Sequence, residues 1–97
     1  MAVFIDNMNM PFGRMVMCHM VADTTDELIQ MCDNIGVNKI WIQHPSTYRE
    51  HFDICVSKKK IAIEKYGAIE ISWREYAEKV FSRPGSPRLS DARGKKV

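Results

Sequence analysis

The sequence predicts an α/β fold: one small domain in which a mostly parallel sheet of about four strands lies between helices, in a three-layer-like arrangement. Short apolar runs alternate along the chain with amphipathic segments, in the order β-β-α-β-α-β-α. Two of the three expected helices open with a capping box. A chain of 97 residues is long enough for one hydrophobic core but not for two.

The first two strands are expected at residues 2–6 and 15–22. Residues 2–6 (AVFID) are an apolar run that ends in an acid, and the NMNMPFGR that follows has the Asn, Pro and Gly of a loop. In residues 15–22 (MVMCHMVA) both alternating sets of side chains are largely apolar, which predicts a strand covered on both faces. His19 is the polar exception in that strand.

The middle of the chain predicts a helix, a strand and a loop. Thr24 and Glu27 have the capping-box spacing, and Gly36 suits the residue that ends the helix. Residues 38–43 (NKIWIQ) are expected to form the third strand. The polar stretch at 44–53 (HPSTYREHFD) is a long loop for a compact domain, and long loops often carry function.

The end of the domain predicts two helices around a short strand. Ser57 can cap a helix over residues 58–66, and residues 68–71 (AIEI) form the last strand. A second capping box (SWRE) opens a helix over residues 73–81, whose apolar stripe is expected in the core.

The alternation of strands and helices predicts a mainly parallel sheet, with the first two strands as its antiparallel exception. In open sheets of this kind, ligands bind beyond the carboxyl ends of strands. Asp6, Asp23 and the loop at 44–53 all follow expected strands directly. We therefore expect them to form one shared site.

Charge divides the chain into two parts. Residues 82–97 carry five Arg or Lys and one Asp, a net charge of +4, whereas residues 1–81 carry nine basic and eleven acidic side chains, a net charge of −2. This predicts a folded domain over 1–81 and a disordered basic tail over 82–97. Nucleic-acid contact is expected to be weak and confined to the tail, because the domain lacks a basic balance.

The sequence favours a cytoplasmic protein with no membrane association. No apolar run approaches the ~18 residues that a membrane span needs, and the N-terminus has no basic start of the kind found in secretory signals. The cysteines, Cys18, Cys32 and Cys55, are odd in number and have no C-x-x-C spacing, which fits reduced thiols.

Two histidines and an acid are the candidate catalytic residues. His51 and Asp53 share a face if their segment is extended, and His19 would be costly to bury without a partner. His51 and Asp53 together could polarise each other, bind a metal or hold a substrate hydroxyl, and a histidine can act as general acid or base. The alternatives are a satisfied core histidine at position 19 and a surface loop with helix-capping acids around residues 51–53.

Two carboxylates that follow strands are the candidate metal ligands. Asp6 and Asp23 are expected to bind a divalent metal such as Mg²⁺ or Mn²⁺, and a nearby histidine would extend the choice to Zn²⁺. The alternative for Asp6 is a carboxylate that only caps the loop after it.

The start of the helix at 58–66 is the candidate anion site. Its first turn carries three lysines, although the helix dipole disfavours cations there. A bound phosphate would explain the placement, and solvated lysines balanced by nearby acids are the alternative. The predicted ligand-binding residues are Asp6, Asp23, Ser57, Lys58 and Lys59.

A series of short blocks along residues 3–76 carries a family resemblance. The blocks are Val3-Phe4-Ile5-Asp6, Cys18-His19-Met20-Val21-Ala22-Asp23 with the helix to Glu27-Leu28, Trp41-Ile42-Gln43, His51-Phe52-Asp53-Ile54, Ser57-Lys58-Lys59 and Gly67-Ala68-Ile69-Glu70. They resemble a family of small bacterial and phage proteins catalogued only as a domain of unknown function. Where that pattern has an aromatic residue before Cys-His, this chain has Met17. Where it has His-Tyr-Asp, this chain has Phe52, so any role of a tyrosine hydroxyl is lost.

The resemblance implies one shared site and no particular reaction. The residues it brings together are Asp6, His19, Asp23, His51, Asp53 and Lys58 or Lys59. It also implies a bacterial or phage-infected bacterial cell as the setting, and it permits a role against host proteins.

Three functions remain open from the sequence. The leading one is binding of a phosphate-containing ligand, such as a nucleotide, at the Asp/His/Lys site. The second is metal-dependent phosphoester hydrolysis, of the kind nucleases perform, by the same residues. The third is a protein-interaction module, for example a phage-encoded inhibitor of a host enzyme, with a protein as its partner. The sequence does not fix the oligomeric state.

Overall fold

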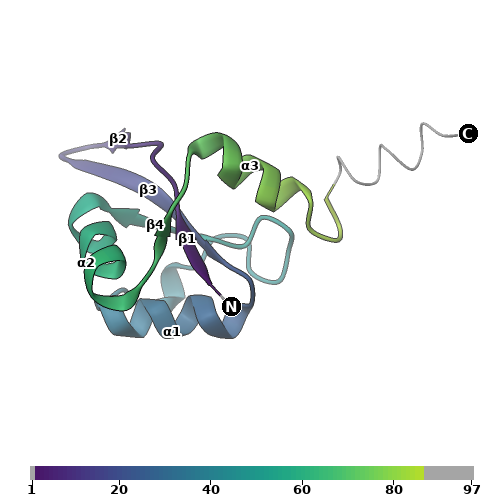
Figure 1. Cartoon of the computed structure of the whole chain (residues 1–97), viewed down its shortest axis with the longest axis horizontal. Helices are drawn as coiled ribbons and strands as arrows, with labels where there is room; N and C mark the ends of the chain where they lie inside the picture. Colours follow the sequence, from purple (N-terminus) through teal and green to yellow (C-terminus); the bar gives the residue numbers. More distant parts are fainter. Residues whose placement is uncertain (1, 87–97) are drawn as a thin grey trace, which may run out of the picture.

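The computed structural model describes residues 2–86 and has an α/β fold with three helices and a five-stranded mixed sheet (Figure 1). The predicted fold class and the three predicted helices are confirmed. In chain order the elements are β1 (Val3–Ile5), β2 (Met10–Phe12), β3 (Met15–Ala22), α1 (Thr25–Ile35), the 3₁₀ turn η1 (Lys39–Trp41), β4 (Phe52–Cys55), α2 (Val56–Tyr66), β5 (Ile69–Glu70) and α3 (Trp73–Phe81). None of the helices within residues 2–86 is long and apolar enough to cross a membrane.

The long strand β3 organises the sheet. It pairs antiparallel with β1, β2 and β4, and β5 adds to β1 in the parallel direction. The expected antiparallel pairing of the first two predicted strands is present. The sheet as a whole is mixed, where a mostly parallel one was expected, because β1–β5 is the one parallel pair among the described strands.

The prediction of a strand at residues 38–43 is wrong, and the strand lies later in the chain. The Asn38 side chain accepts a hydrogen bond from the Ile40 backbone N–H (3.1 Å) and caps a 3₁₀ turn instead. The strand is β4, which begins in the last two residues of the predicted loop, and in it buried Phe52 and Ile54 alternate with exposed Asp53. The chain reverses once more at residues 44–50, between the bridged Gln43 and His51, so β4 runs against β3.

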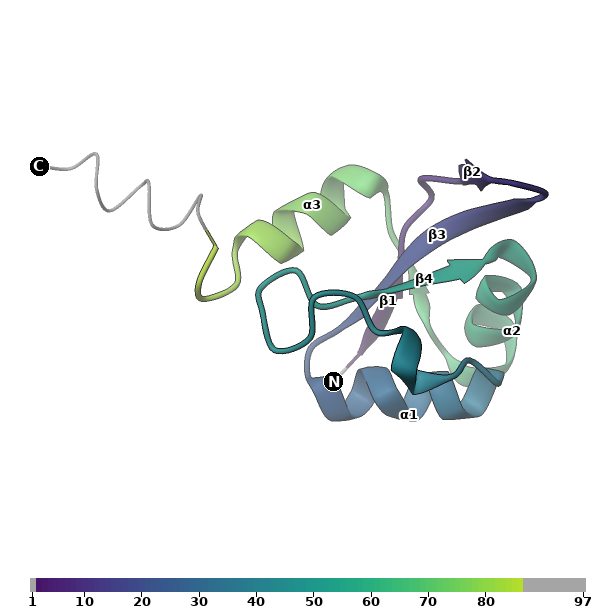
Figure 2. The same ribbon diagram turned by 180° about the vertical axis from the view of Figure 1, so that it is seen from behind.

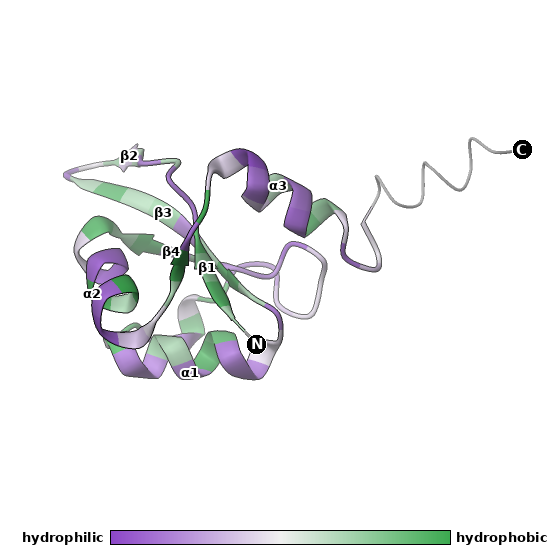
Figure 3. Ribbon diagram, in the orientation of Figure 1, coloured by the Kyte–Doolittle hydropathy of each residue, from purple (hydrophilic) through white to green (hydrophobic). Residues whose placement is uncertain are grey.

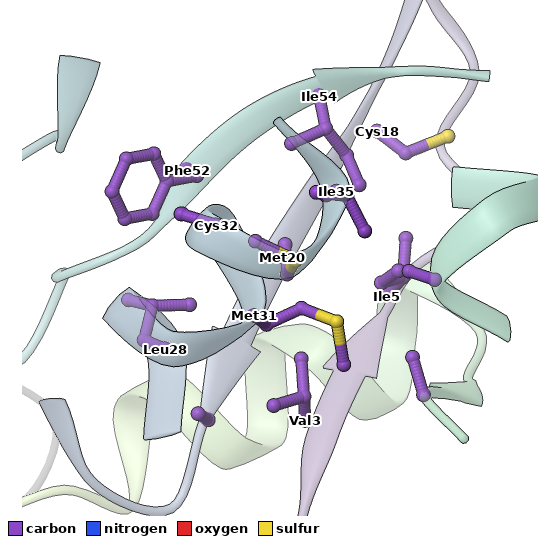
Figure 4. Close-up of a cluster of buried hydrophobic side chains, with 13 residues drawn as sticks. Val3, Ile5, Cys18, Met20, Leu28, Met31, Cys32, Ile35, Phe52 and Ile54 are labelled. Atoms are coloured by element: carbon purple, nitrogen blue, oxygen red, sulfur yellow. The ribbon is translucent and has the colours of Figure 1, made fainter. Parts of the chain in front are cut away.

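One face of the sheet packs against α1 and α2 to form the core (Figure 4). Apolar residues line β1, β3 and β4 where these strands cross the middle of the molecule (Figure 3). The sheet side chains in this core that are at most 1% exposed are Ile5, Cys18, Met20, Phe52 and Ile54. Burial of each large apolar side chain of this kind stabilises the fold by about 1.5–3 kcal/mol.

The predicted ends of α1 and α3 are present, but the predicted Ser57 cap is wrong, because α2 begins at Val56 after Cys55 and has no side-chain cap. The Thr24 hydroxyl accepts the Glu27 backbone N–H (3.2 Å) at the start of α1, and Gly36 ends that helix with a φ of 75°, in the left-handed region. Ser72 and Glu75 form the complete capping box at the start of α3.

Helix α3 lies on the opposite side of the sheet from α1 (Figures 1 and 2). Its apolar stripe was expected in the core, but Trp73 is 48% exposed and Phe81 is 37% exposed. In this helix Val80 is the buried residue. Tyr76 stacks on His19, with ring centroids 4.6 Å apart. The helix therefore brings an aromatic ring to the polar side chains on the second face of the sheet.

Candidate metal centre

Strands β1, β3 and β4 bring four predicted site residues together on the face of the sheet beneath α3. His19 of β3 and Asp53 of β4 are direct cross-strand partners, so their side chains leave the sheet on the same face. His51 precedes Asp53 by two residues and shares that face. Asp6 follows β1, and its backbone N–H donates to the His19 carbonyl (3.0 Å).

Asp6 fixes the orientation of the His19 ring. The Asp6 carboxylate is fully buried, and its Oδ1 accepts the backbone N–H groups of His19 (2.9 Å) and Met8 (3.3 Å). Its Oδ2 lies 2.7 Å from His19 Nδ1. Burial alone would raise the pKa of Asp6, but these hydrogen bonds together hold it below its ordinary value. An ionised carboxylate can only accept, so the His19 proton lies on Nδ1.

A backbone carbonyl fixes the orientation of the His51 ring in the same way. His51 Nδ1 lies 2.6 Å from the carbonyl oxygen of Arg49. A carbonyl has no proton to donate, so His51 Nδ1–H is the donor. Both histidines therefore use Nδ1 to donate, and both present Nε2 to the same place.

Asp53 lies where the two Nε2 atoms converge. Its Oδ1 is 3.2 Å from His51 Nε2 and 3.9 Å from His19 Nε2. In the neutral rings each Nε2 carries a lone pair, so three lone-pair-bearing atoms face one another. The closest pair, His51 Nε2 and Asp53 Oδ1 at 3.2 Å, attract each other when a proton or a metal ion lies between them. In the metal-free protein, hydrogen bonding from His51 lowers the pKa of Asp53, and the hydrogen bond to Asp6 raises the pKa of His19.

The three ligand atoms have a spacing close to that of a metal site. The donor atoms of His19, His51 and Asp53 all lie within 4.8 Å of one another. Four ligands at ~2.0–2.1 Å in a tetrahedral site are about 3.3 Å apart. The His51–Asp53 distance of 3.2 Å already matches this spacing, the His19–Asp53 distance of 3.9 Å would have to shorten by about 0.6 Å, and the widest separation, up to 4.8 Å, by as much as about 1.5 Å. Two imidazoles and one carboxylate suit Zn²⁺ or Fe²⁺ better than Mg²⁺.

Arg83 holds the loop that carries His51. Its guanidinium donates to the carbonyl oxygens of Tyr48 (3.0 Å), Glu50 (3.1 Å) and Ala22 (3.0 Å), which joins the loop to the end of β3. Sequence reasoning assigned Arg83 to the tail, but residues 82–86 are described and Arg83 contacts the domain. The rest of the predicted tail, residues 87–97, lies outside the described residues.

Buried Glu50 supports the same loop from within. Its carboxylate accepts the Thr25 hydroxyl (2.7 Å) and the Ser46 backbone N–H (3.0 Å). Sequence reasoning missed Glu50, Arg83 and Tyr76 as parts of the site. The one sequence signal for Tyr76 was a hydroxyl-bearing residue within an otherwise apolar helix stripe.

The two predicted metal ligands do not come together. Both carboxylate oxygens of Asp6 accept hydrogen bonds from the protein, and one of these bonds orients the His19 ring. Asp23 follows the far end of β3 and accepts the Ala2 backbone N–H (2.9 Å). Asp23 lies four positions after His19 along an extended chain, a distance of ~13 Å at about 3.3 Å per residue.

The residues predicted to bind an anion have other contacts. Lys59 is buried, and its ammonium group pairs with Glu70 (2.7 Å) and donates to the Asp6 carbonyl (2.9 Å). Lys58 points its ammonium group toward Gly36 at the end of α1. The Ser57 hydroxyl lies 3.1 Å from the Cys55 thiol.

A cavity of about 640 Å³ opens beside the centre. His19 and Asp53 line it together with side chains from the β2–β3 hairpin and from the segment that follows α1. The other lining residues are Met10, Pro11, Phe12, Met15, Met17, Cys18, Val37, Trp41 and Gln43.

Comparison with known proteins gives a family and no close relative. No curated protein and no solved structure matches the chain. Residues 3–83 match the family DUF4031, which is described as a protein of unknown function. The match includes β1 through α3 and extends to Arg83, so it contains every residue of the centre and the arginine that holds its loop. The chain therefore belongs to the DUF4031 family.

Proposed function

We propose that this protein is a metal-dependent hydrolase, in which His19, His51 and Asp53 hold a divalent transition metal such as Zn²⁺. One observation carries the proposal: both Nδ1 atoms donate to fixed acceptors, which leaves both Nε2 lone pairs directed at one carboxylate. Carboxylate or carbonyl acceptors behind the ligating histidines are a regular feature of metal sites, because they fix the tautomer and raise the basicity of the ligand.

The residues predicted as general acid and base take the role of metal ligands in this proposal. A bound zinc ion lowers the pKa of a coordinated water to about 7, so that hydroxide is available near neutral pH. Asp6 and the Arg49 carbonyl orient the two rings, and Arg83 fixes the loop that bears His51. The Tyr76 ring covers one side of His19 and shields it from solvent. Three protein ligands leave a coordination position for water or substrate.

Hydrolysis needs only water as its second reactant. Two histidines and one carboxylate also form the ligand set of non-haem iron oxygenases, but that chemistry requires oxygen and a source of electrons in addition. We therefore assign hydrolysis and use a panel of metals to test it.

Binding of a phosphate at the start of α2 has less geometric support. Lys59 neutralises Glu70, and the described lining of the cavity beside the centre contains no lysine or arginine. The phosphate-binding hypothesis stays a prediction of the sequence, and phosphate compounds belong in the same test.

The first experiment is titration of the metal-free protein with Zn²⁺ and Co²⁺. Wild-type protein should bind one ion, and Co²⁺ should give the visible absorption of a low-coordinate site. Asp53→Asn and His51→Ala should weaken metal binding by more than about 100-fold. This exceeds the usual effect of removing a residue that only hydrogen-bonds to a metal ligand. Asp53 is 43% exposed, so its replacement should leave the fold intact.

His44→Ala is the matched control. His44 is the one histidine of the three in the chain that is not among the converging ligands. Its ring centroid lies 6.1 Å from that of His51. Equal metal affinity of wild-type protein and Asp53→Asn would refute the centre. A tight metal site with no turnover of ester, amide or phosphoester substrates would refute the hydrolase and leave the metal centre.

A further inference from the structure

The cavity beside the centre differs chemically from the phosphate site predicted from the sequence. Among its lining residues, Asp53 carries a negative charge and no lysine or arginine is present. A phosphate dianion in this cavity would face that carboxylate, and the metal ion alone would offset the repulsion. The lining therefore disfavours an anionic substrate.

The walls of the cavity are apolar and unusually exposed. Phe12 is 71% exposed and Trp41 is 65% exposed, and three methionines, Met10, Met15 and Met17, line the cavity with them. Large exposed apolar side chains that line a cavity are typical of a binding site. Methionine side chains are flexible and polarisable, so they adapt to aromatic and aliphatic groups alike.

Strand register connects these walls to the metal ligands. Met10 pairs with Met17, and Met17 pairs with Cys55, in the row next to the His19–Asp53 pair. Directly paired residues share a face of the sheet, so the apolar row lies beside the ligands on the same face. Gln43 adds an uncharged amide to the lining, which can donate to a carbonyl oxygen or accept from an amide N–H.

We propose that this cavity binds the apolar part of an uncharged carboxylic ester or amide and presents its carbonyl group to the centre of His19, His51 and Asp53. The inference rests on the hydrolase proposed above and specifies its substrate class. In the reaction the water oxygen bonds to the carbonyl carbon, and the bond from that carbon to the leaving oxygen or nitrogen breaks. The bond's electron pair stays on the leaving atom, which takes one of the water protons. The products are a carboxylic acid and an alcohol or an amine.

Binding can be tested without catalysis, because a tryptophan lies in the wall. The chain has two tryptophans, so Trp73→Phe leaves Trp41 as the one tryptophan fluorophore. The metal-free Trp73→Phe protein is titrated with butyranilide, which is uncharged, and with phenyl phosphate, which carries a similar ring on an anion. Butyranilide should shift the Trp41 emission at concentrations where phenyl phosphate has no effect.

A wall variant and a matched control locate the binding. Phe12→Ala in the Trp73→Phe background should weaken butyranilide binding about tenfold, equivalent to ~1.4 kcal/mol. Ile61→Ala, which removes an exposed apolar side chain of α2 outside the cavity, should leave the affinity unchanged. Equal weakening by both variants would overturn the location.

Hydrolysis by the zinc-loaded wild-type protein separates the two proposals. Faster turnover of p-nitrophenyl butyrate than of p-nitrophenyl acetate, with Phe12→Ala abolishing the difference, supports the cavity. Butyranilide binding without any hydrolysis supports the cavity and refutes the hydrolase. Hydrolysis with equal rates for both esters and no butyranilide binding overturns the cavity and leaves the hydrolase. Preferential binding of phenyl phosphate overturns the substrate class and favours the phosphate site.

Discussion

Replacing Asp6 by Asn tests the hydrogen bonds that prepare the centre. The substitution keeps the shape of the side chain but exchanges one carboxylate oxygen for an NH₂ donor. In the protein Oδ1 accepts two backbone N–H groups and Oδ2 accepts His19 Nδ1–H. An asparagine has one acceptor oxygen, so either orientation of its amide places a donor against a donor.

Two effects of different origin follow from this conflict. The buried unsatisfied donor should lower the free energy of unfolding of the metal-free protein by about 1–3 kcal/mol. A shift of the His19 proton to Nε2 would relieve the conflict in place of that loss of stability, and it would remove the lone pair from the metal site. Loss of such a supporting group typically weakens metal binding by about 10–100-fold, equivalent to ~1.4–2.8 kcal/mol.

The assay is a competition titration of Zn²⁺ against a chromophoric chelator, paired with urea unfolding of the metal-free proteins. Asp33→Asn makes the same chemical change at an exposed position of α1, so it should have wild-type affinity. A folded Asp6→Asn protein that binds Zn²⁺ as tightly as wild type would refute the role of Asp6 in orienting His19.

Three further outcomes follow from the structure. The hydrogen bond to Asp6 raises the pKa of His19 above 6.5, so as the pH is lowered the Zn²⁺ affinity should already begin to fall before pH 6.5 is reached. In the metal-free protein the Asp6–His19 pair should contribute its full stabilisation between pH 3.8 and 6.5, which urea unfolding at a series of pH values measures. That contribution is lost as pH rises through the raised pKa of His19, and also as pH falls through the lowered pKa of Asp6. Arg83→Met removes three hydrogen bonds to carbonyl groups and should cost about 2 kcal/mol in urea unfolding, against no change for Arg14→Met. Ile54→Ala should cost about 2–5 kcal/mol and Ile40→Ala less than ~0.5 kcal/mol, because Ile54 is 1% exposed and Ile40 is 72% exposed; equal costs would contradict the position of β4.

Local sequence signals predicted the elements that have local causes. The capping boxes located the starts of α1 and α3, and a largely apolar run located β3. The prediction of a strand at residues 38–43 failed because an apolar run indicates a strand whether or not its side chains are buried. The Asn38 cap, which favours a 3₁₀ turn, lies at the edge of that run. The alternation of Phe52, Asp53 and Ile54 was the better strand signal, although it lay in a polar setting.

The direction of the strands decided which predicted site residues meet. The antiparallel pairing expected for the first two predicted strands already places the residues that follow them at opposite edges of the sheet, which conflicts with a site shared by Asp6 and Asp23. In the antiparallel pair the end of β1 lies beside the middle of β3, so Asp6 reaches His19 while Asp23 lies at the opposite edge. Sequence spacing could indicate Asp6, His19, His51 and Asp53 as polar residues near strands, but the hydrogen-bonded arrangement depends on long-range pairing that local patterns do not encode.

The dependence of the His51 loop on Arg83 sets an order of assembly during synthesis. All three proposed ligands have left the ribosome once the chain has passed residue 53, but the arginine that fastens their loop follows only after α3. Its contacts join residues 33 to 61 positions apart, so they can form only after the chain has been synthesised through Arg83. A nascent chain would carry the complete ligand set before it had a rigid centre, and metal that arrived early would meet ligands still free to move.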